Sequence, residues 1–213
     1  MMPMLTQQPL SGFLDDVASR TPAPGGGSVA ALSGALGAAL TSMVCNLTIG
    51  KKSYAGVEAE MQRLLADAER LRSQFTTLID RDTLAFGKVM EAYALPRESA
   101  DQKALRNAAI QGATKEAALV PLEVMKHTVD ALALARTAAD KGNTNSASDA
   151  GVSALMLHAA CEAAALNVLI NLNTIEDTDF VGWRRDEVHS LLKTARSSSE
   201  EVLGLVRTKL ADI

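Results

Sequence analysis

The chain has 213 residues, 47% of them hydrophobic but only 3% aromatic, and a formal net charge of −4 at pH 7. This length is enough for one hydrophobic core and does not require a second domain, so we expect a single domain over residues 1–213. The acidic balance and the lack of a long basic run argue against a nucleic-acid partner. Because Ala and Leu favour helices, whereas sheets depend on β-branched and aromatic residues, we predict an all-α fold.

Cysteine usage and the first residues bear on the compartment. Cys45 and Cys161 both lie in apolar helical patterns, where a thiol behaves as a small hydrophobic group. Two such cysteines do not form a disulfide framework. The first ten residues lack the basic and apolar regions of a signal peptide. We therefore expect a cytoplasmic protein.

A triple-glycine loop is predicted between the first two helices. Apolar residues recur at helical spacing over residues 10–17, and Pro22 and Pro24 end that helix. Residues 25–27 are all glycine. Ser28 follows them and is a favourable N-cap, because its hydroxyl can accept from the free amides of the next turn. The second helix is therefore predicted to begin at Ser28.

This second helix carries no charged residue from Ser28 to about residue 49. About 20 apolar residues can cross a bilayer, but this stretch is mostly Ala, Gly, Ser and Thr and lacks the Leu, Ile and Phe that drive insertion. We expect a helix buried on all sides and no membrane partner. Gly34 and Gly37 each cost roughly 1 kcal/mol of helix propensity relative to Ala, which indicates close approach of a neighbouring backbone. Gly50 is expected to stop the helix.

Two long amphipathic helices are predicted next. One runs from about residue 57 to residue 93, with apolar residues recurring at intervals of three and four. The other follows a capping box formed by Ser99 and Gln102 and continues to about residue 139. Pro121 is expected to kink this helix or split it in two.

A second nearly uncharged helix and a last amphipathic helix complete the pattern. The polar segment 140–148 leads into the uncharged helix over residues 149–172. After a loop at 173–182, the last helix runs to the C-terminus. The sequence thus predicts a single-domain helical bundle with two buried apolar helices surrounded by long amphipathic helices.

Each apolar helix begins beside a candidate binding loop. Free amides after the glycine loop suit an anion or a carbonyl group, although a tight turn into a buried helix explains the same residues. The second loop concentrates more amide, hydroxyl and carboxylate groups than capping of one turn requires. Its polar residues are Asn143, Asn145, Ser146, Ser148 and Asp149.

Asp82 is the carboxylate closest to an apolar stripe. It lies three positions after Ile79 and four before Phe86, so it is either part of a solvated face or partly buried. A partly buried carboxylate needs a partner or has a shifted pKa.

The remaining polar groups on predicted helices do not suggest a metal. The three histidines lie on three different helices, without the i,i+4 spacing of helical zinc ligands, so we expect neither a metal nor a cofactor. Asn167 and Asn171 share one face of the second uncharged helix and either bridge helices or line a cavity.

Several segments together resemble a known family. They are the stretch from Pro22 to Tyr54, the D-x-x-A-F element from Asp82 to Phe86, and the segments YALP at 93–96, KGNTNSASDAGV at 141–152 and NVLINL at 167–172. In this order they resemble the cyclodeaminase/cyclohydrolase family, which includes the cyclodeaminase half of formiminotransferase-cyclodeaminase and the stand-alone methenyltetrahydrofolate cyclohydrolases. The resemblance implies an all-helical protein that forms at least a homodimer and needs no metal.

The resemblance also implies a folate reaction. The expected activity is hydrolysis of 5,10-methenyltetrahydrofolate to 10-formyltetrahydrofolate. The alternatives are formimidoyltetrahydrofolate cyclodeamination and a helical folate-binding or scaffold protein without catalysis. Asp82 and Asp149 are the catalytic candidates, one near the substrate cation and one exchanging protons, with the two roles open.

Substrate-binding candidates follow from the same implication. Hydrogen-bonding partners for the pterin are Asn46, Asn143, Asn145 and Ser148, with Asn167 as a further polar group of the pocket. The anionic tail of the folate, one glutamate or a polyglutamate, is expected at Lys51 and Lys52 or at the amides of Gly26, Gly27 and Ser28.

Overall fold

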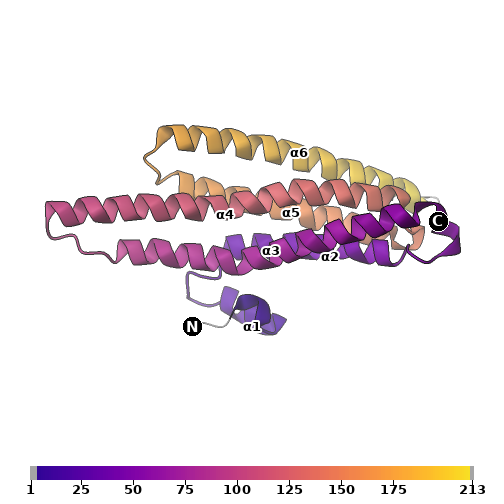
Figure 1. Cartoon of the computed structure of the whole chain (residues 1–213), viewed down its shortest axis with the longest axis horizontal. Coiled ribbons are helices and arrows are strands. Elements are labelled where there is room, and N and C mark those ends of the chain that lie inside the picture. Colours follow the sequence, from indigo (N-terminus) through magenta and orange to yellow (C-terminus); the bar gives the residue numbers. More distant parts are fainter. Residues whose placement is uncertain (1–3, 212–213) are drawn as a thin grey trace.

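The computed structural model describes residues 4–211 and shows an elongated bundle of helices (Figure 1). Its α-helices are α1 (Leu10–Val17), α2 (Gly26–Asn46), α3 (Glu58–Tyr93), α4 (Ala100–Lys141), α5 (Ala147–Leu172) and α6 (Thr178–Ala211). Three short 3-10 helices, η1 (Leu5–Gln7), η2 (Lys52–Val57) and η3 (Thr144–Ser146), lie between or before them. Within these described residues there is no strand, so the all-α prediction is confirmed.

Small residues let α2 approach its neighbours closely. A Cβ atom added at Gly34 would lie 2.5 Å from Cε1 of Phe75 in α3, and one added at Gly37 would lie 2.6 Å from Cγ of Leu157 in α5. Both glycines are buried. Both glycines thus allow a close approach, but the predicted neighbouring backbone is found only at Gly37, where the Ser153 carbonyl oxygen would lie 3.1 Å from an added Cβ atom; at Gly34 the group in contact is the Phe75 side chain.

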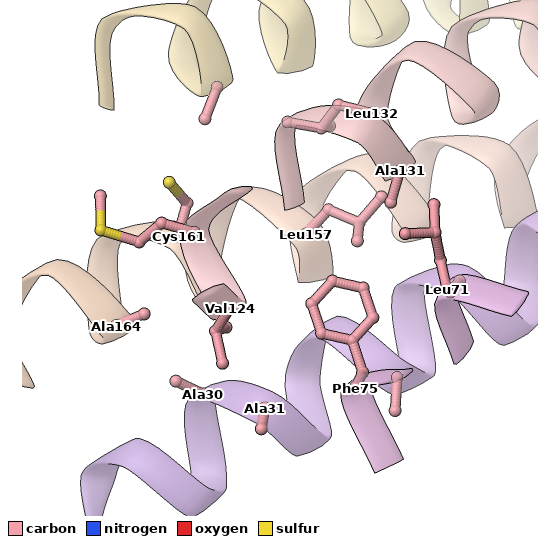
Figure 2. Close-up of a cluster of buried hydrophobic side chains, with 14 of the residues drawn as sticks. Ala30, Ala31, Leu71, Phe75, Val124, Ala131, Leu132, Leu157, Cys161 and Ala164 are labelled. Carbon is pink, nitrogen blue, oxygen red and sulfur yellow. The ribbon is translucent and has the colours of Figure 1, made fainter. Parts of the chain in front are cut away.

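The hydrophobic core lies where α2, α3, α4 and α5 meet. Figure 2 shows the ring of Phe75 between Ala31 of α2 and Leu157 of α5, all three of which are buried. Cys45 and Cys161 are free and buried in this core, and burial raises the pKa of each thiol to about 12. Both cysteines therefore pack as small apolar groups, as predicted.

The prediction that the two uncharged helices are buried on all sides is wrong for one face. α2 and α5 pack against each other in antiparallel directions, since Gly26 lies against Asn167 and Gly37 against Leu157, and both helices also contact α4. A row of large apolar side chains on each stays exposed, including Leu36 at 48% and Ile170 at 67% of their full accessibility. We call this the α2–α5 face; its exposed residues are Val29, Leu36, Met43, Leu47, Val152, Leu155, Leu166 and Ile170.

By length and composition alone, these two helices could each cross a bilayer. The apolar windows of α2 and of residues 144–172 are 61% and 44% buried inside the protein. Contacts with other helices therefore account for much of their apolar surface, and the α2–α5 face accounts for the rest.

Several helix boundaries differ from the prediction. α2 begins at Gly26 with Gly25 as N-cap, so the prediction that Ser28 is the N-cap is wrong. The helix ends at Asn46, before the predicted end near residue 49, and Gly50 has a left-handed φ of 79° in the turn that follows. α4 continues unbroken through Pro121, so this proline does not split the helix.

The remaining boundaries agree more closely. The capping box of Ser99 and Gln102 at the start of α4 is confirmed. α5 begins at Ala147, two residues before the predicted start, and α6 begins at Thr178, inside the predicted loop at 173–182.

Gly37→Ala is expected to lower the free energy of unfolding by roughly 1–3 kcal/mol, because the new methyl group overpacks the contact with Leu157. Gly87→Ala is the matched control. Gly87 also lies inside a helix, but a Cβ atom there meets nothing within 4 Å, so this change should stabilise the protein by up to about 1 kcal/mol. Urea unfolding of both variants measures the difference, and equal stabilities would contradict the close contact.

Candidate active site

Asp82 lies at the N-terminus of α2, although it belongs to α3. Its Oδ2 atom accepts a hydrogen bond from the Ser28 hydroxyl at 3.0 Å. The other oxygen, Oδ1, lies directly against the Cα atom of Gly27, where any Cβ atom would overlap the carboxylate. Gly27 is therefore the residue that lets the Asp82 carboxylate reach the end of α2.

The environment of Asp82 makes its carboxylate easier to protonate. Burial between α2 and α3 raises the pKa of Asp82, and the polar groups of Ser28 oppose this effect without cancelling it. Half-burial keeps part of the carboxylate accessible to solvent. A reachable carboxylate with a raised pKa is suited to accept a proton and return it.

Asn167 of α5 lies on the other side of the glycine turn. A Cβ atom at Gly26 would lie 3.1 Å from its Nδ2 atom. That Nδ2 donates to the Ala163 carbonyl at 2.8 Å, and Asn171 Nδ2 donates to the Asn167 carbonyl at 2.9 Å. The side chains of Asn167 and Asn171 thus donate within α5 and do not bridge helices. Three helices meet in what we call the Asp82 cluster: Gly26, Gly27, Ser28, Asp82 and Asn167.

The fold exposes the members of this cluster to different degrees. Ser28 is fully buried, so its side chain is not available to substrate. The Asp82 carboxylate lies beside the N-terminus of α2, so an anion of the chain itself already sits at this helix end. Gly26, in contrast, is exposed beside Asn167.

The loop at residues 143–149 packs at the opposite end of α2. The Asn143 N–H donates to Thr48 Oγ1 at 2.9 Å, and its Nδ2 donates to the Leu47 carbonyl at 2.9 Å. Asn143 Oδ1 accepts from the Asn145 N–H at 3.1 Å. Asn143 is buried, and both ends of its side-chain amide are used to hold the loop, so its predicted contact with substrate is not supported.

Tyr54 is a further polar residue at this end that sequence reasoning did not single out. Its hydroxyl accepts a hydrogen bond from the Thr144 N–H at 3.0 Å, and hydrogen bonds with Thr144 lower the pKa of Tyr54. In the sequence, its only signal was its position as the last residue of the stretch from Pro22 to Tyr54. The Asp149 end, as we call this region, presents a half-buried Asp149 and five exposed polar residues: Asn46, Lys51, Lys52, Asn145 and Ser148.

The two groups of candidates are far apart within one chain. Gly27 and Asn46 are separated by nineteen residues of α2, which at 1.5 Å per residue is about 28 Å. Asp82 lies at the first end and Asp149 at the second. A single pocket that contains both carboxylates is therefore not formed within one chain.

Among residues 4–211, no group of three or more His, Cys, Asp or Glu side chains is placed to hold a metal ion. The chemistry available at the two ends is therefore that of carboxylate, amide, hydroxyl and ammonium groups.

Comparison with known proteins gives a consistent result. The family model described as formiminotransferase-cyclodeaminase matches residues 9–190. The chain is 44% identical over 207 residues to a methenyltetrahydrofolate cyclohydrolase of Methylorubrum extorquens, covering 97% of this chain and 100% of that protein. It is 35% identical to the formimidoyltransferase-cyclodeaminase of Mus musculus, over 94% of this chain but only 37% of the mouse protein.

A solved structure is similar as well. The formiminotetrahydrofolate cyclodeaminase of Thermotoga maritima superposes with a TM-score of 0.86 at 35% sequence identity, covering 95% of this chain and 97% of that one. The similarity extends over nearly the whole bundle.

Proposed function

We propose that this chain, which belongs to the formiminotransferase-cyclodeaminase family, is an enzyme that hydrolyses 5,10-methenyltetrahydrofolate to 10-formyltetrahydrofolate. Similarity along the full length of a stand-alone cyclohydrolase supports this choice over the bifunctional relatives, of which the chain spans only about a third. The observation that carries the proposal is the Asp82 carboxylate, held against Gly27 with a raised pKa.

The substrate carries a positive charge shared by N5, the bridging carbon and N10. Ionised Asp82 takes a proton from water as the water oxygen bonds to this carbon. The carbinol formed then loses its hydroxyl proton to solvent, the bond between carbon and N5 breaks, and Asp82 returns its proton to N5. One water is consumed and one proton is released overall.

The carboxylate acts on the cation as well as on water. A negative charge close to the delocalised cation stabilises it by direct attraction in a partly desolvated site. Since the substrate carbon is already electrophilic, the proposed reaction requires neither a metal nor another cofactor.

Cyclodeamination is the second candidate, supported by the similarity to the cyclodeaminases of Thermotoga maritima and mouse. In that reaction N10 attacks the formimino carbon, and a protonated carboxyl group donates to the departing ammonia. Both reactions share the methenyl cation, so the Asp82 cluster suits either one.

Ultraviolet absorbance of the methenyl cation separates the candidates. Hydrolysis removes this absorbance when enzyme is added to methenyltetrahydrofolate, at a rate proportional to enzyme concentration. Cyclodeamination instead generates the absorbance from formimidoyltetrahydrofolate and releases ammonia. Folate binding without either change would contradict both reactions and leave a non-catalytic folate-binding or scaffold protein.

We further propose that the enzyme is a homodimer through the α2–α5 face. The two helices carry only two charged residues, Asp149 and Glu162, so a partner for this face must itself be apolar. A second copy of the chain offers the same row of apolar side chains. In an isologous interface each patch covers its equivalent on the other chain.

The direction of the two copies follows from charge. Asp82 gives one end of the α2–α5 pair a negative charge, whereas Lys51 and Lys52 lie at the other end. An antiparallel two-fold arrangement places the acidic end of each protomer against the lysine end of its partner. The Asp82 cluster of one protomer would then lie close to the Asp149 end of the other.

Such a dimer would unite the groups that a single chain keeps about 28 Å apart. Asp82 and the partner's Asp149 would lie on either side of the folate, with Asn46, Asn145 and Ser148 available to the pterin. Lys51 and Lys52 would lie at the glutamate tail. A cytoplasmic location, where folates are used, is part of the same proposal.

Lys51→Ala is expected to raise KM for polyglutamylated substrate roughly five-fold more than KM for the monoglutamate, which corresponds to ~1 kcal/mol for one exposed charge pair. Lys103→Ala is the control, because Lys103 is an exposed lysine on α4. Steady-state kinetics with both substrates test the effect, and equal changes in the two KM values would remove Lys51 from the tail site.

A further inference from the structure

The Ser28 hydroxyl has more partners than it has protons. It lies 3.1 Å from the Ile79 carbonyl oxygen, 3.0 Å from Asp82 Oδ2 and 3.3 Å from the Thr83 hydroxyl. A serine hydroxyl carries one proton and two acceptor lone pairs, so it donates to only one of these groups at a time. Because Ser28 is fully buried, water does not supply the missing partners.

The protonation state of Asp82 decides which arrangement is satisfied. An ionised carboxylate only accepts, so the Ser28 proton must point to Oδ2, and the Thr83 hydroxyl can donate to the Ser28 oxygen. A protonated Asp82 can donate to the Ser28 oxygen, and Ser28 can then turn its proton to the Ile79 carbonyl. In both states no buried hydroxyl or carboxyl oxygen is left without a partner, which would otherwise cost its full desolvation.

We propose that Ser28 is a positioning residue that turns its hydroxyl between Asp82 and the Ile79 carbonyl as Asp82 loses and regains its proton. This inference rests on the proposed function, in which Asp82 cycles between base and acid. Ser28 acts through Asp82 and does not contact the folate. The Ser28 hydroxyl thereby keeps the carboxyl group in one orientation through both halves of the reaction.

No other charged side chain among the described residues shifts the pKa of Asp82. α2 carries no charged side chain. On α3, Arg81 pairs with Glu123 at 2.8 Å and Asp80 accepts from the Leu5 N–H at 2.6 Å. On α5, Glu162 pairs with Arg196 and Asp149 lies at the far end; the exposed Asp15 and the half-buried Asp16 belong to α1. None of these contributes to the shifted pKa of Asp82, which reflects burial and Ser28 alone.

The test is the pH dependence of kcat in Ser28→Ala. The Ser28 hydroxyl stabilises the ionised form of Asp82, so its loss should raise the pKa of this carboxyl group further. The rising limb of the plot of kcat against pH should then move to higher pH by about one unit. Turnover should recover at pH values above the new limb. Ser28→Cys, which keeps a weaker donor, should give a smaller shift in the same direction.

Ser33→Ala is the matched control on the same helix. The Ser33 hydroxyl donates to the Met156 carbonyl at 2.7 Å, away from Asp82, so its removal should leave the limb in place. In an Asp82→Asn background, Ser28→Ala should have no further effect on the residual rate. If both Ser28 variants lower kcat equally at every pH, Ser28 has only a structural role and the inference is overturned.

The same set of variants separates the inference from the proposed function. Wild-type turnover by Asp82→Asn would overturn the role of Asp82 as base. An inactive Asp82→Asn combined with an unshifted limb in the Ser28 variants would overturn only the role of Ser28. If Ser28→Ala does not fold, the limb of Ser28→Cys decides the question by the same criterion.

Discussion

Asp82→Asn is expected to lower turnover of methenyltetrahydrofolate by about 10²- to 10⁴-fold, the usual contribution of a general base. The amide keeps the shape of the carboxylate and an oxygen that can accept from Ser28, but it does not take a proton from water. The rate loss should appear in kcat, measured as the disappearance of methenyl absorbance, because the reacting proton is transferred after substrate binding.

The same variant should remain folded. The pKa of Asp82 is higher in the folded than in the unfolded state, so ionisation of this carboxyl group opposes folding. The protonated group therefore favours folding at low pH, and this contribution is lost as pH rises through the folded-state pKa. At neutral pH the neutral amide removes that cost. We expect the free energy of unfolding of Asp82→Asn to equal or exceed that of the wild type, measured by urea unfolding at pH 7.

Asp80→Asn provides the control for both measurements. Asp80 lies two residues earlier on α3, but its carboxylate accepts from the Leu5 N–H at 2.6 Å and from the Thr6 hydroxyl at 2.8 Å. It therefore holds the N-terminal segment and faces away from the Asp82 cluster. Turnover close to wild type in Asp80→Asn and in Asp82→Asn alike would contradict the assignment of Asp82 as the base.

Mixing inactive Asp82→Asn and Asp149→Asn chains is expected to restore activity if the site is shared between protomers. A mixed dimer then has one site with both substitutions and one site with both carboxylates intact. With random exchange, half of the dimers are mixed, and activity should recover to roughly a quarter of the wild-type value for an isologous pair. The measurement is turnover before and after subunit exchange of the two purified variants.

Leu166→Glu in both chains tests whether the α2–α5 face forms the dimer in which activity recovers. Leu166 is 70% exposed in the single chain, and a charge there would be buried between two protomers. The substitution should give monomers by light scattering and abolish the recovery. Leu105→Glu, at a residue 71% exposed on α4, should leave both the dimer and the recovery unchanged. No recovery in a mixed but intact dimer would contradict the shared site.

Helix locations were predictable because their causes are local. The helical spacing of apolar residues placed α3 to within about one residue, and the capping pattern identified the start of α4. The small residues of α2 correctly indicated close contact at Gly34 and Gly37. The N-cap of α2 was misplaced because a serine after three glycines suits capping equally well, and only the packing of α3 shows that its hydroxyl is directed to Asp82.

The site was predictable only in part, because local patterns mark its residues but do not show their contacts with distant segments. The sequence and its family resemblance indicated Asp82, the glycine loop and the loop at residues 143–149, since each stands out by composition or motif. They did not show that the Asn143 side chain is hydrogen-bonded to the Leu47 carbonyl or that the Tyr54 hydroxyl is bonded to Thr144. Those facts depend on hydrogen bonds between residues about 90 positions apart along the chain.

The sequence by itself determined the helices, their uncharged pair and the chemical groups available for a folate reaction. The tertiary structure decided where those groups lie, because α2 and α5 pack antiparallel and each therefore brings a different loop to each end of the pair. That arrangement buries Ser28, sets Asp82 against Gly27 and leaves Asp149 at the other end. Periodicity is a property of one helix, whereas the meeting of two helix ends depends on packing between distant segments, which no local pattern specifies.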